Sequence, residues 1–216
     1  MKRDYSHAAM LENAKNAFDD SFQARLDIID SEDNIQVLHW RKPGTNAYSI
    51  RAVFDGHRVY ITGDLGSAIV ALTERATPQS LSTYGRSVDY FIEKIVTSTD
   101  KYEYNPELAR EELHERLLYV RENQKQAYTA DPDLMVGELC EKLDELDETI
   151  QNIETKLMDS YSTKTGFCPY VEDMEEYTRL DPDYFEWMGT AGRVVAKRIY
   201  LWLAAFELAW KQLKEE

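Results

Sequence analysis

Cysteine is scarce in this sequence of 216 residues: only Cys140 and Cys168 occur, and they form no Cys-x-x-Cys pair. Two isolated cysteines provide no disulfide framework, so we expect free thiols in a reducing compartment, the cytoplasm. Long apolar runs are also absent, because the most apolar window, residues 199–210, is too short to span a bilayer and contains Glu207. The first residues lead into a polar helical pattern and not into an apolar signal core. The sequence therefore predicts a cytoplasmic protein without membrane contact.

The motifs of common active sites are missing as well. The four histidines are scattered, and the chain contains no His-Glu-x-x-His, no Gly-rich phosphate loop and no Gly-x-Ser-x-Gly. Glu111 and His114 form one Glu-x-x-His, but a di-iron site of the helical-bundle type needs two such pairs and further glutamates. Cys168 has no histidine near it in the sequence and is interpreted as an ordinary buried thiol. We therefore expect no catalytic residue, no metal site and no cofactor.

Positive charge is also in deficit. The chain carries 25 Lys and Arg against 40 Asp and Glu, a formal net charge of −15. Residues 101–216 hold 26 of the acidic residues but only 14 of the basic ones. A surface this negative repels phosphate backbones, which argues against direct nucleic-acid binding by residues 101–216. The same charge suits a basic protein surface, including one built to hold nucleic acid, or serves solubility alone.

Apolar residues are plentiful enough to fill a core, at 43% of the chain, and in the first hundred residues their pattern predicts a small sheet. Ser6 is a candidate N-cap for a helix reaching Phe18. Residues 25–35 alternate poorly and are expected to contain a turn. Clear alternation and turn signals then predict three antiparallel strands, at residues 35–41, 47–54 and 57–62. Residues 67–76 fit a fourth strand or a short helix equally well.

The remainder of the chain is predicted to be helical. A capping residue followed by proline marks four helix starts: Thr77-Pro78, Asn105-Pro106, Asp131-Pro132 and Asp181-Pro182. The third helix carries an unbroken heptad pattern of apolar residues: Val136, Leu139, Leu143, Leu146, Ile150, Ile153 and Leu157. Matching residues Leu113 and Leu117 in the preceding helix favour an antiparallel hairpin over pairing of two chains in a homodimer. A last helix at residues 190–213 is apolar over a wide arc, so more than one neighbour must bury it.

We therefore predict an α+β protein of two parts. An antiparallel β-meander with flanking helices occupies residues 1–100. An acidic helical domain, with a helical hairpin and a long C-terminal helix, occupies residues 101–216. The C-terminal helix holds the helical domain together and is also a candidate for docking on the sheet.

The first candidate binding surface is basic and lies on the predicted meander. Trp40 and Tyr60 stand beside a group of cationic residues: Arg41, Lys42, Arg51, His57 and Arg58. Basic residues interleaved with aromatic residues on a sheet bind single-stranded nucleic acid or a phosphate ligand. The same pattern also describes the solvent-facing side of a sheet that is covered on its other side.

The second candidate surface is acidic and aromatic and lies in residues 170–187. Its predicted partner-binding residues are Glu172, Asp173, Glu175, Glu176, Tyr177, Asp181, Asp183 and Tyr184. Aromatic anchors surrounded by carboxylates suit a basic groove on another protein. In the alternative interpretation, this segment links two helices and its aromatic side chains are tucked inward.

The segment Gly63-Asp64-Leu65-Gly66 has two interpretations. The favoured one is a turn that needs glycine at positive φ, because the segment lacks the Lys-Ser/Thr and the third glycine of a phosphate loop. The alternative places Asp64 at the end of a strand, as a metal ligand or a general base. A carboxylate-dependent nuclease or nucleotide hydrolase would follow from that alternative.

Two short motifs in the predicted meander resemble known sequences. WRKPGTNAYSI at residues 40–50 and VYITGDLG at residues 59–66 look like a family of uncharacterised proteins from phages and prophages of Gram-positive bacteria. The similarity covers about residues 35–105, and no catalytic role is attached to these motifs. A small accessory phage protein of this build resembles inhibitors of bacterial defence, such as anti-CRISPR proteins. The resemblance implies action in the host bacterial cytoplasm.

Three hypotheses about function result. The leading one is a phage-encoded inhibitor that binds a host defence protein, such as a CRISPR effector nuclease, and places carboxylates where phosphates should lie. The alternative is a nucleic-acid-binding phage accessory protein that uses the basic face of the meander. The third is the carboxylate-dependent enzyme centred on Asp64.

Overall fold

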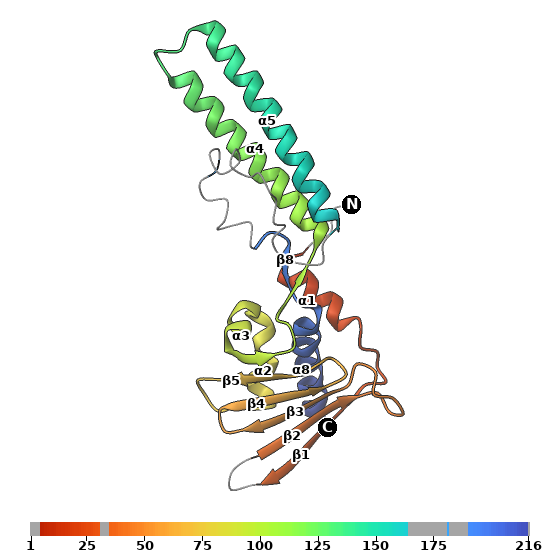
Figure 1. Cartoon of the computed structure of the whole chain (residues 1–216). Helices are drawn as coiled ribbons and strands as arrows, with labels where there is room; N and C mark the ends of the chain where they lie inside the picture. Colours follow the sequence, from red (N-terminus) through yellow and green to blue (C-terminus); the bar gives the residue numbers. More distant parts are fainter. Residues whose placement is uncertain (1–4, 31–34, 164–180, 182–189, 216) are drawn as a thin grey trace. The chain divides into compact units, whose positions relative to one another are not determined.

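A computed structural model gives the fold, and it describes the following residues: 5–30, 35–163, 181 and 190–215. The chain divides into two compact units (Figure 1). Unit 1 comprises residues 1–101 and 195–216, and unit 2 comprises residues 102–194. Strands and helices are both present, which confirms the predicted α+β class. The expected boundary near residue 100 recurs, but the C-terminal helix belongs to the unit that holds the sheet and not to the helical unit.

Unit 1 is built on a six-stranded antiparallel sheet. Its strands are β1 (Gln23–Asp30), β2 (Ile35–Arg41), β3 (Ile50–Asp55), β4 (Arg58–Gly63), β5 (Ala68–Ala71) and β6 (Ile95–Ser98). Each strand pairs with the next one along the chain, so the topology is a meander. The three predicted strands correspond to β2, β3 and β4. Of the two alternatives for residues 67–76, the strand is correct, because β5 lies there and not a short helix. The sheet continues beyond the prediction at both edges, through β1 and β6.

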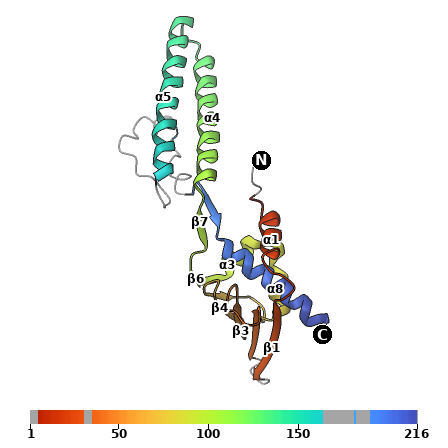
Figure 2. The same ribbon diagram turned by 90° about the vertical axis from the view of Figure 1, so that its right-hand side faces the viewer.

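Helices cover one face of this sheet (Figures 1 and 2). They are α1 (His7–Lys15), α2 (Pro78–Ser82), the 3-10 helix η1 (Tyr84–Arg86), α3 (Val88–Lys94) and α8 (Lys197–Glu215). Two rows of cross-strand neighbours supply the buried side chains of the sheet: Leu38, Ala52, Ile61 and Ala68 in one row, and Phe54, Val59 and Val70 in the next. Burial of each leucine, isoleucine, valine or phenylalanine among them stabilises the fold by about 1.5–3 kcal/mol before the entropy of ordering is counted.

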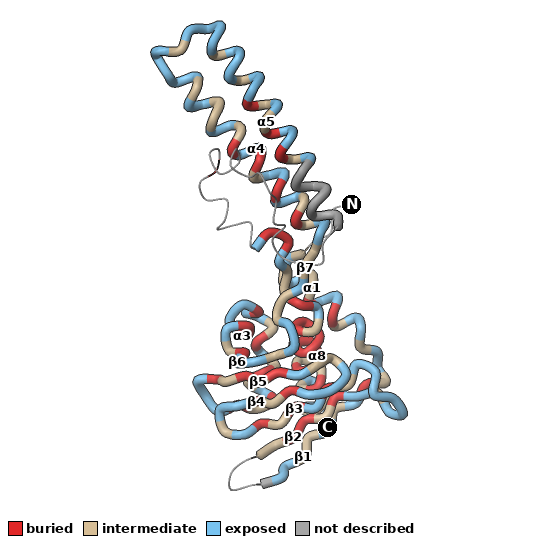
Figure 3. The backbone as a smooth tube through the Cα atoms, viewed as in Figure 1, coloured by how far each residue is buried: buried red, intermediate tan, exposed pale blue. Residues whose placement is uncertain are grey.

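The C-terminal helix α8 lies at the centre of the core. Every side chain from Ile199 to Phe206 is buried, and Trp202 is fully enclosed (Figure 3). Helices α1 and α2 and strand β1 all pack against α8. A helix that is apolar on all sides needs neighbours on all sides, so the prediction of several neighbours is confirmed. These neighbours, however, belong to the unit that contains the sheet and not to the helical hairpin.

Capping residues set most of the helix starts as predicted. Ser6 Oγ accepts from Ala9 N, Thr77 forms a capping box with Ser80, and Asn105 accepts from two backbone N–H groups. The third predicted start is wrong. Asp131 is instead the C-cap of the preceding helix, and the next helix begins at Val136. The pair Asp131-Pro132 therefore marks the end of a helix and not the start of one, because proline is also common just after a C-cap.

The two family-like motifs meet at the end of strands β3 and β4. Tyr48 adopts a left-handed backbone conformation (φ +57°), and its N–H donates to Asp64 Oδ2 at 2.7 Å. Asp64 N donates in turn to the carbonyl oxygen of Ser49 at 3.0 Å. Gly63 (φ +135°) lies so close that a Cβ atom would sit 2.2 Å from that oxygen. The motifs therefore build one tight turn, in which Asp64 holds the conformation of Tyr48.

Unit 2 contains the predicted antiparallel helical hairpin. Helix α4 (Pro106–Ala130) packs against α5 (Val136–Thr163), and a two-stranded sheet of β7 (Tyr102–Tyr104) and β8 (Arg193–Val195) accompanies them. The buried seam consists of Leu113, Leu117, Val120, Leu146, Ile150 and Ile153. Arg121 adds a two-pronged ion pair with Asp147, at 2.6 and 2.5 Å. The heptad pattern begins before this seam, because Val136 at its start is 78% exposed. The side chain of Leu157 lies outside the described ones.

We predict that Gly63→Ala lowers the free energy of unfolding by about 3 kcal/mol or more, because it adds a backbone clash to an unfavourable φ. Gly44→Ala is the matched control: its φ is also positive, +81°, but a Cβ atom there meets nothing within 4 Å. We expect that control to cost only about 1–2 kcal/mol. Urea unfolding followed by tryptophan fluorescence measures both. Equal losses in the two variants would contradict the close approach at Ser49.

Candidate functional site

In unit 1, the face of the sheet opposite the helices carries no described helix. Strand β3 shows the alternation, since Arg51, Val53 and Asp55 point to this face between the buried residues of the strand. We call the surface the open face, and its residues are Gln23, Arg25, Asp27, Val37, His39, Arg41, Arg51, Val53, Asp55, Arg58, Tyr60, Thr62, Ile69 and Ala71.

The pairing register orders the open face into rows that run across the strands. A polar row contains Arg25, His39, Arg51 and Thr62 on four successive strands. The next row contains Asp27 and four mostly apolar residues, Val37, Val53, Tyr60 and Ile69; Val37 is buried, and the other three are half-buried. Arg58 follows in the third row, and Arg41 flanks the polar row on its other side. An apolar row with one aromatic ring therefore lies between arginines on both sides.

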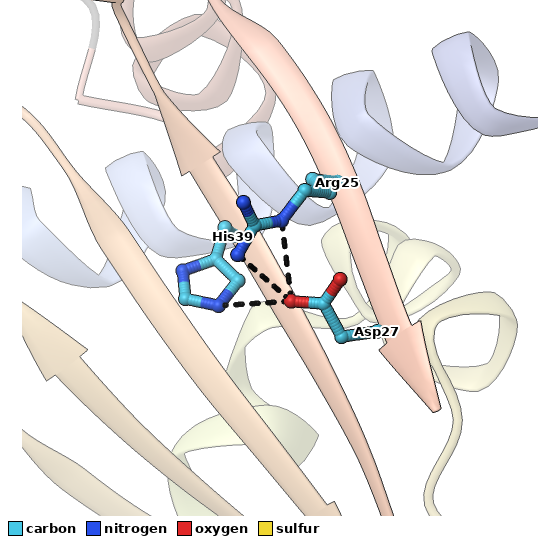
Figure 4. Close-up of polar contacts among 3 residues, drawn as sticks. All are labelled: Arg25, Asp27 and His39. Carbon is cyan, nitrogen blue, oxygen red and sulfur yellow. Dashed lines mark hydrogen bonds and ion pairs between the residues drawn. The ribbon is translucent and has the colours of Figure 1, made fainter. Parts of the chain in front are cut away.

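The centre of the polar row is a three-residue cluster (Figure 4). Arg25 Nε and Nη2 both donate to Asp27 Oδ2, at 3.2 and 2.9 Å. His39 Nε2 lies 3.6 Å from the same oxygen. One carboxylate oxygen thus faces a guanidinium and an imidazole from two neighbouring strands. The guanidinium of Arg25 and the imidazole of His39 therefore converge on the position that this oxygen occupies.

The environment of His39 disfavours its charged form. Its side chain is only 24% exposed, and burial is the largest influence that lowers its pKa below the usual value. Arg25, Arg51 and Arg41 lower the pKa further by repulsion, while Asp27 acts in the opposite direction. The cluster therefore holds a neutral imidazole among three permanent positive charges.

Three of the four predicted nucleic-acid-binding residues share the open face, namely Arg41, Arg51 and Arg58. None of these three has an ion-pair partner among the described residues. Lys42 lies beyond the end of β2 and donates to Asp19 Oδ2 at 2.9 Å. Hydrogen bonds from Ser21 and Lys42 hold the pKa of Asp19 down to about 2. Lys42 is therefore tied to a carboxylate, and the three arginines are not.

The aromatic part of the prediction is half right in its placement. Tyr60 lies on the open face, but Trp40 lies on the covered face, where it stacks on Phe22 and is buried. Arg25 and His39 are not among the predicted site residues. Residues 25–35 are predicted to contain a turn, so no strand is expected beside His39 on that side. The signal was present: polar Gln23, Arg25 and Asp27 alternate with apolar residues in β1.

The predicted acidic surface falls almost entirely outside the described residues. These are Glu172, Asp173, Glu175, Glu176, Tyr177, Asp183 and Tyr184. Asp181 is described and is 3% exposed, with its two oxygens accepting from Arg116 at 2.8 and 2.7 Å. A buried carboxylate of this kind is part of an internal ion pair and is not presented to a partner.

Unit 2 does carry an exposed acidic stripe on α5. It consists of Glu138, Glu141, Asp144, Glu145 and Glu148, all exposed. These positions recur every three to four residues, on the side of α5 opposite the buried seam. Lys142 is the one exposed cation within the stripe. The stripe is about 15 Å long at the usual helical rise.

Asp64 and His114 each have a partner among the described residues. Asp64 accepts from the backbone of Tyr48, and His114 Nδ1 lies 2.7 Å from Glu154 Oε1 across the hairpin. No group of three or more His, Cys, Asp or Glu side chains with metal-binding geometry occurs among the described residues. Within the same part of the chain, no helix has both the length and the apolarity needed to cross a bilayer.

Comparison with known proteins returned no match: no family model, no curated protein and no solved structure is similar to this chain at a significant level.

We predict that His39 makes the stability of unit 1 depend on pH. The pKa of His39 is lower in the folded state than in the unfolded state, where it is about 6.5. The contribution of neutral His39 to the free energy of unfolding is therefore complete above the unfolded-state pKa. It is lost as the pH falls through the folded-state pKa. Wild type should therefore lose more stability than His39→Gln on acidification. Urea unfolding at several pH values measures this difference. An equal change of the free energy of unfolding with pH in both proteins would show that the pKa of His39 is not lowered by folding.

Proposed function

We propose that the protein binds single-stranded nucleic acid through the open face of its sheet. One observation supports this function: arginines that form no ion pair lie next to an apolar row that contains Tyr60. Arginines attract phosphates and form two-pronged hydrogen bonds with them. Bases stack on exposed aromatic and apolar side chains with little sequence preference. The protein would then act as an accessory protein of the phage type that its motifs resemble.

The geometry favours a single strand over a duplex. The apolar row lies within the face and between the arginines, so a ligand has to present base faces and phosphates to the sheet at once. A splayed single strand does this, whereas a duplex keeps its bases stacked inside. The strongly negative remainder of the chain repels long polyanions and restricts binding to this face.

The expected affinity is modest and sensitive to salt. Contacts to phosphate without base readout give dissociation constants of roughly 10⁻⁴ to 10⁻⁶ M. Four arginines that each neutralise one phosphate of a single strand give a slope of roughly −3 in log affinity against log salt. A sequence-specific interaction would show a much weaker effect of salt relative to its affinity.

We predict that Arg51→Ala and Arg58→Ala each weaken binding of a labelled oligothymidylate about tenfold, the loss of one charged hydrogen bond of about 1.5 kcal/mol. Arg86→Ala is the matched control, because Arg86 is an exposed cation on η1, on the covered side of the sheet. Fluorescence anisotropy at low salt measures all four proteins. Absence of binding by wild type at low salt would refute the proposal, and retention of an acidic protein by the same face would redirect it to a protein partner.

The acidic stripe of α5 favours a second candidate function. We propose, as this alternative, that the protein inhibits a host defence nuclease by presenting carboxylates to its nucleic-acid channel. Exposed carboxylates along a helix resemble the charge spacing of a polyanion, and they suit a basic channel. The acidic residues predicted from sequence between Glu172 and Glu176 would extend the same kind of surface.

For this alternative we predict that charge reversal abolishes inhibition of target cleavage by a CRISPR effector nuclease. Two variants carry it: one changes Glu172, Asp173, Glu175 and Glu176 to Lys, and the other changes Glu141, Asp144, Glu145 and Glu148 to Lys. The control reverses four exposed carboxylates of unit 1, Glu12, Glu74, Glu93 and Asp100, with the same change in net charge. Inhibition that survives in both test variants would exclude mimicry by these carboxylates.

A further inference from the structure

Of the groups on the open face, only His39 can change its charge near neutral pH. It is the central member of the polar row, with Arg25 beside it on β1 and Arg51 beside it on β3. Neighbouring strands are about 4.8 Å apart, so both guanidinium groups reach the surroundings of the imidazole. A phosphate held by these two arginines therefore lies next to His39.

The charges around His39 come from three strands. Arg25 and Asp27 face it from β1, Arg41 lies on its own strand, and Arg51 faces it from β3. Only Asp27 favours the imidazolium, and Asp27 Oδ2 already accepts two hydrogen bonds from Arg25. Without a ligand the balance is repulsive, so the imidazole stays neutral.

A bound phosphate reverses this balance. It adds negative charge at the point where the arginines converge, and it offers oxygens to an imidazole N–H. The imidazolium then gains an opposite charge and a hydrogen bond, both of which favour the protonated form. The proton comes from the solvent, so binding of the ligand and uptake of one proton are linked.

We infer that His39 is a phosphate ligand of the open face and that it takes up a proton when a phosphate group of the nucleic acid binds. This inference rests on the proposed function. It assigns the central contact to His39 together with Arg25 and Arg51, and it makes affinity for nucleic acid increase as the pH falls.

Asp27 has a defined part in this arrangement. Its Oδ2 atom occupies the position at which the guanidinium of Arg25 and the imidazole of His39 converge, so it competes with an incoming phosphate oxygen. Asp27→Asn removes that competing charge and should tighten binding. The same change removes the one group that raises the pKa of free His39, so the pH dependence of binding becomes steeper.

The test measures the affinity of the full chain for a labelled oligothymidylate at about pH 8 and about pH 6, on either side of the usual histidine pKa. Wild type should bind severalfold more tightly at the lower pH than at the higher, because binding is linked to uptake of one proton. His39→Gln should bind with the same affinity at both values. His114→Gln is the matched control, because His114 is an exposed histidine of α4 in unit 2, outside the open face, and should keep the wild-type response.

Proton NMR gives a readout that needs no substitution. The titration midpoint of the His39 ring signal should rise when the oligothymidylate is added, and inorganic phosphate should raise it less. Binding with an equal pH response in wild type and His39→Gln would overturn the inference and leave the proposed function standing. No binding at either pH would overturn both.

Discussion

The need to surround α8 shapes the whole of unit 1. Its side chains are buried continuously from Ile199 to Phe206, so the helix must have neighbours on every side. The sheet provides one side, and α1 and α2 provide others, which draws the described helices of this unit to a single face. An α+β unit that places its helices on one face leaves the other face of the sheet for solvent or a ligand. The open face is therefore a consequence of how the C-terminal helix is buried.

The composition of the open face fits this role. This face carries four arginines against the two carboxylates of Asp27 and Asp55, and Arg41, Arg51 and Arg58 form no ion pair among the described residues. Clustered arginines repel one another, and their repulsion lowers the pKa of His39. Electrostatic repulsion of this kind is typical of binding sites, where a ligand neutralises the charge. In a chain with a net charge of −15, a basic cluster of this kind stands out further.

Sequence reasoning recovers the local parts of the fold and misses those that depend on partners. The turns Pro43-Gly44 and Asp55-Gly56 predict β2 to β4, and the heptad pattern predicts the hairpin. The edge strand β1 is stabilised by pairing with β2, and its short alternation does not stand out beside the polar residues that follow it. This one omission removes Arg25 from the candidate site and hides His39 as its cross-strand neighbour. Trp40 shows the same limit, because only the register decides which face a side chain joins.

The most distinctive residues of the sequence motifs lie in the turn around Tyr48 and Asp64, whereas the candidate binding residues lie on the open face. Asp64 is a candidate metal ligand or general base in the sequence, and in the structure Asp64 and Gly63 hold the backbone around Tyr48 and fix the ends of β3 and β4. Fixing those ends holds the register that sets Arg51 opposite His39 and Arg58 beyond Tyr60. A shift of one residue would send each of these side chains to the covered face. In the proposed function, the turn would therefore serve binding indirectly, because it keeps the arginines on the side of the sheet where a phosphate can reach them.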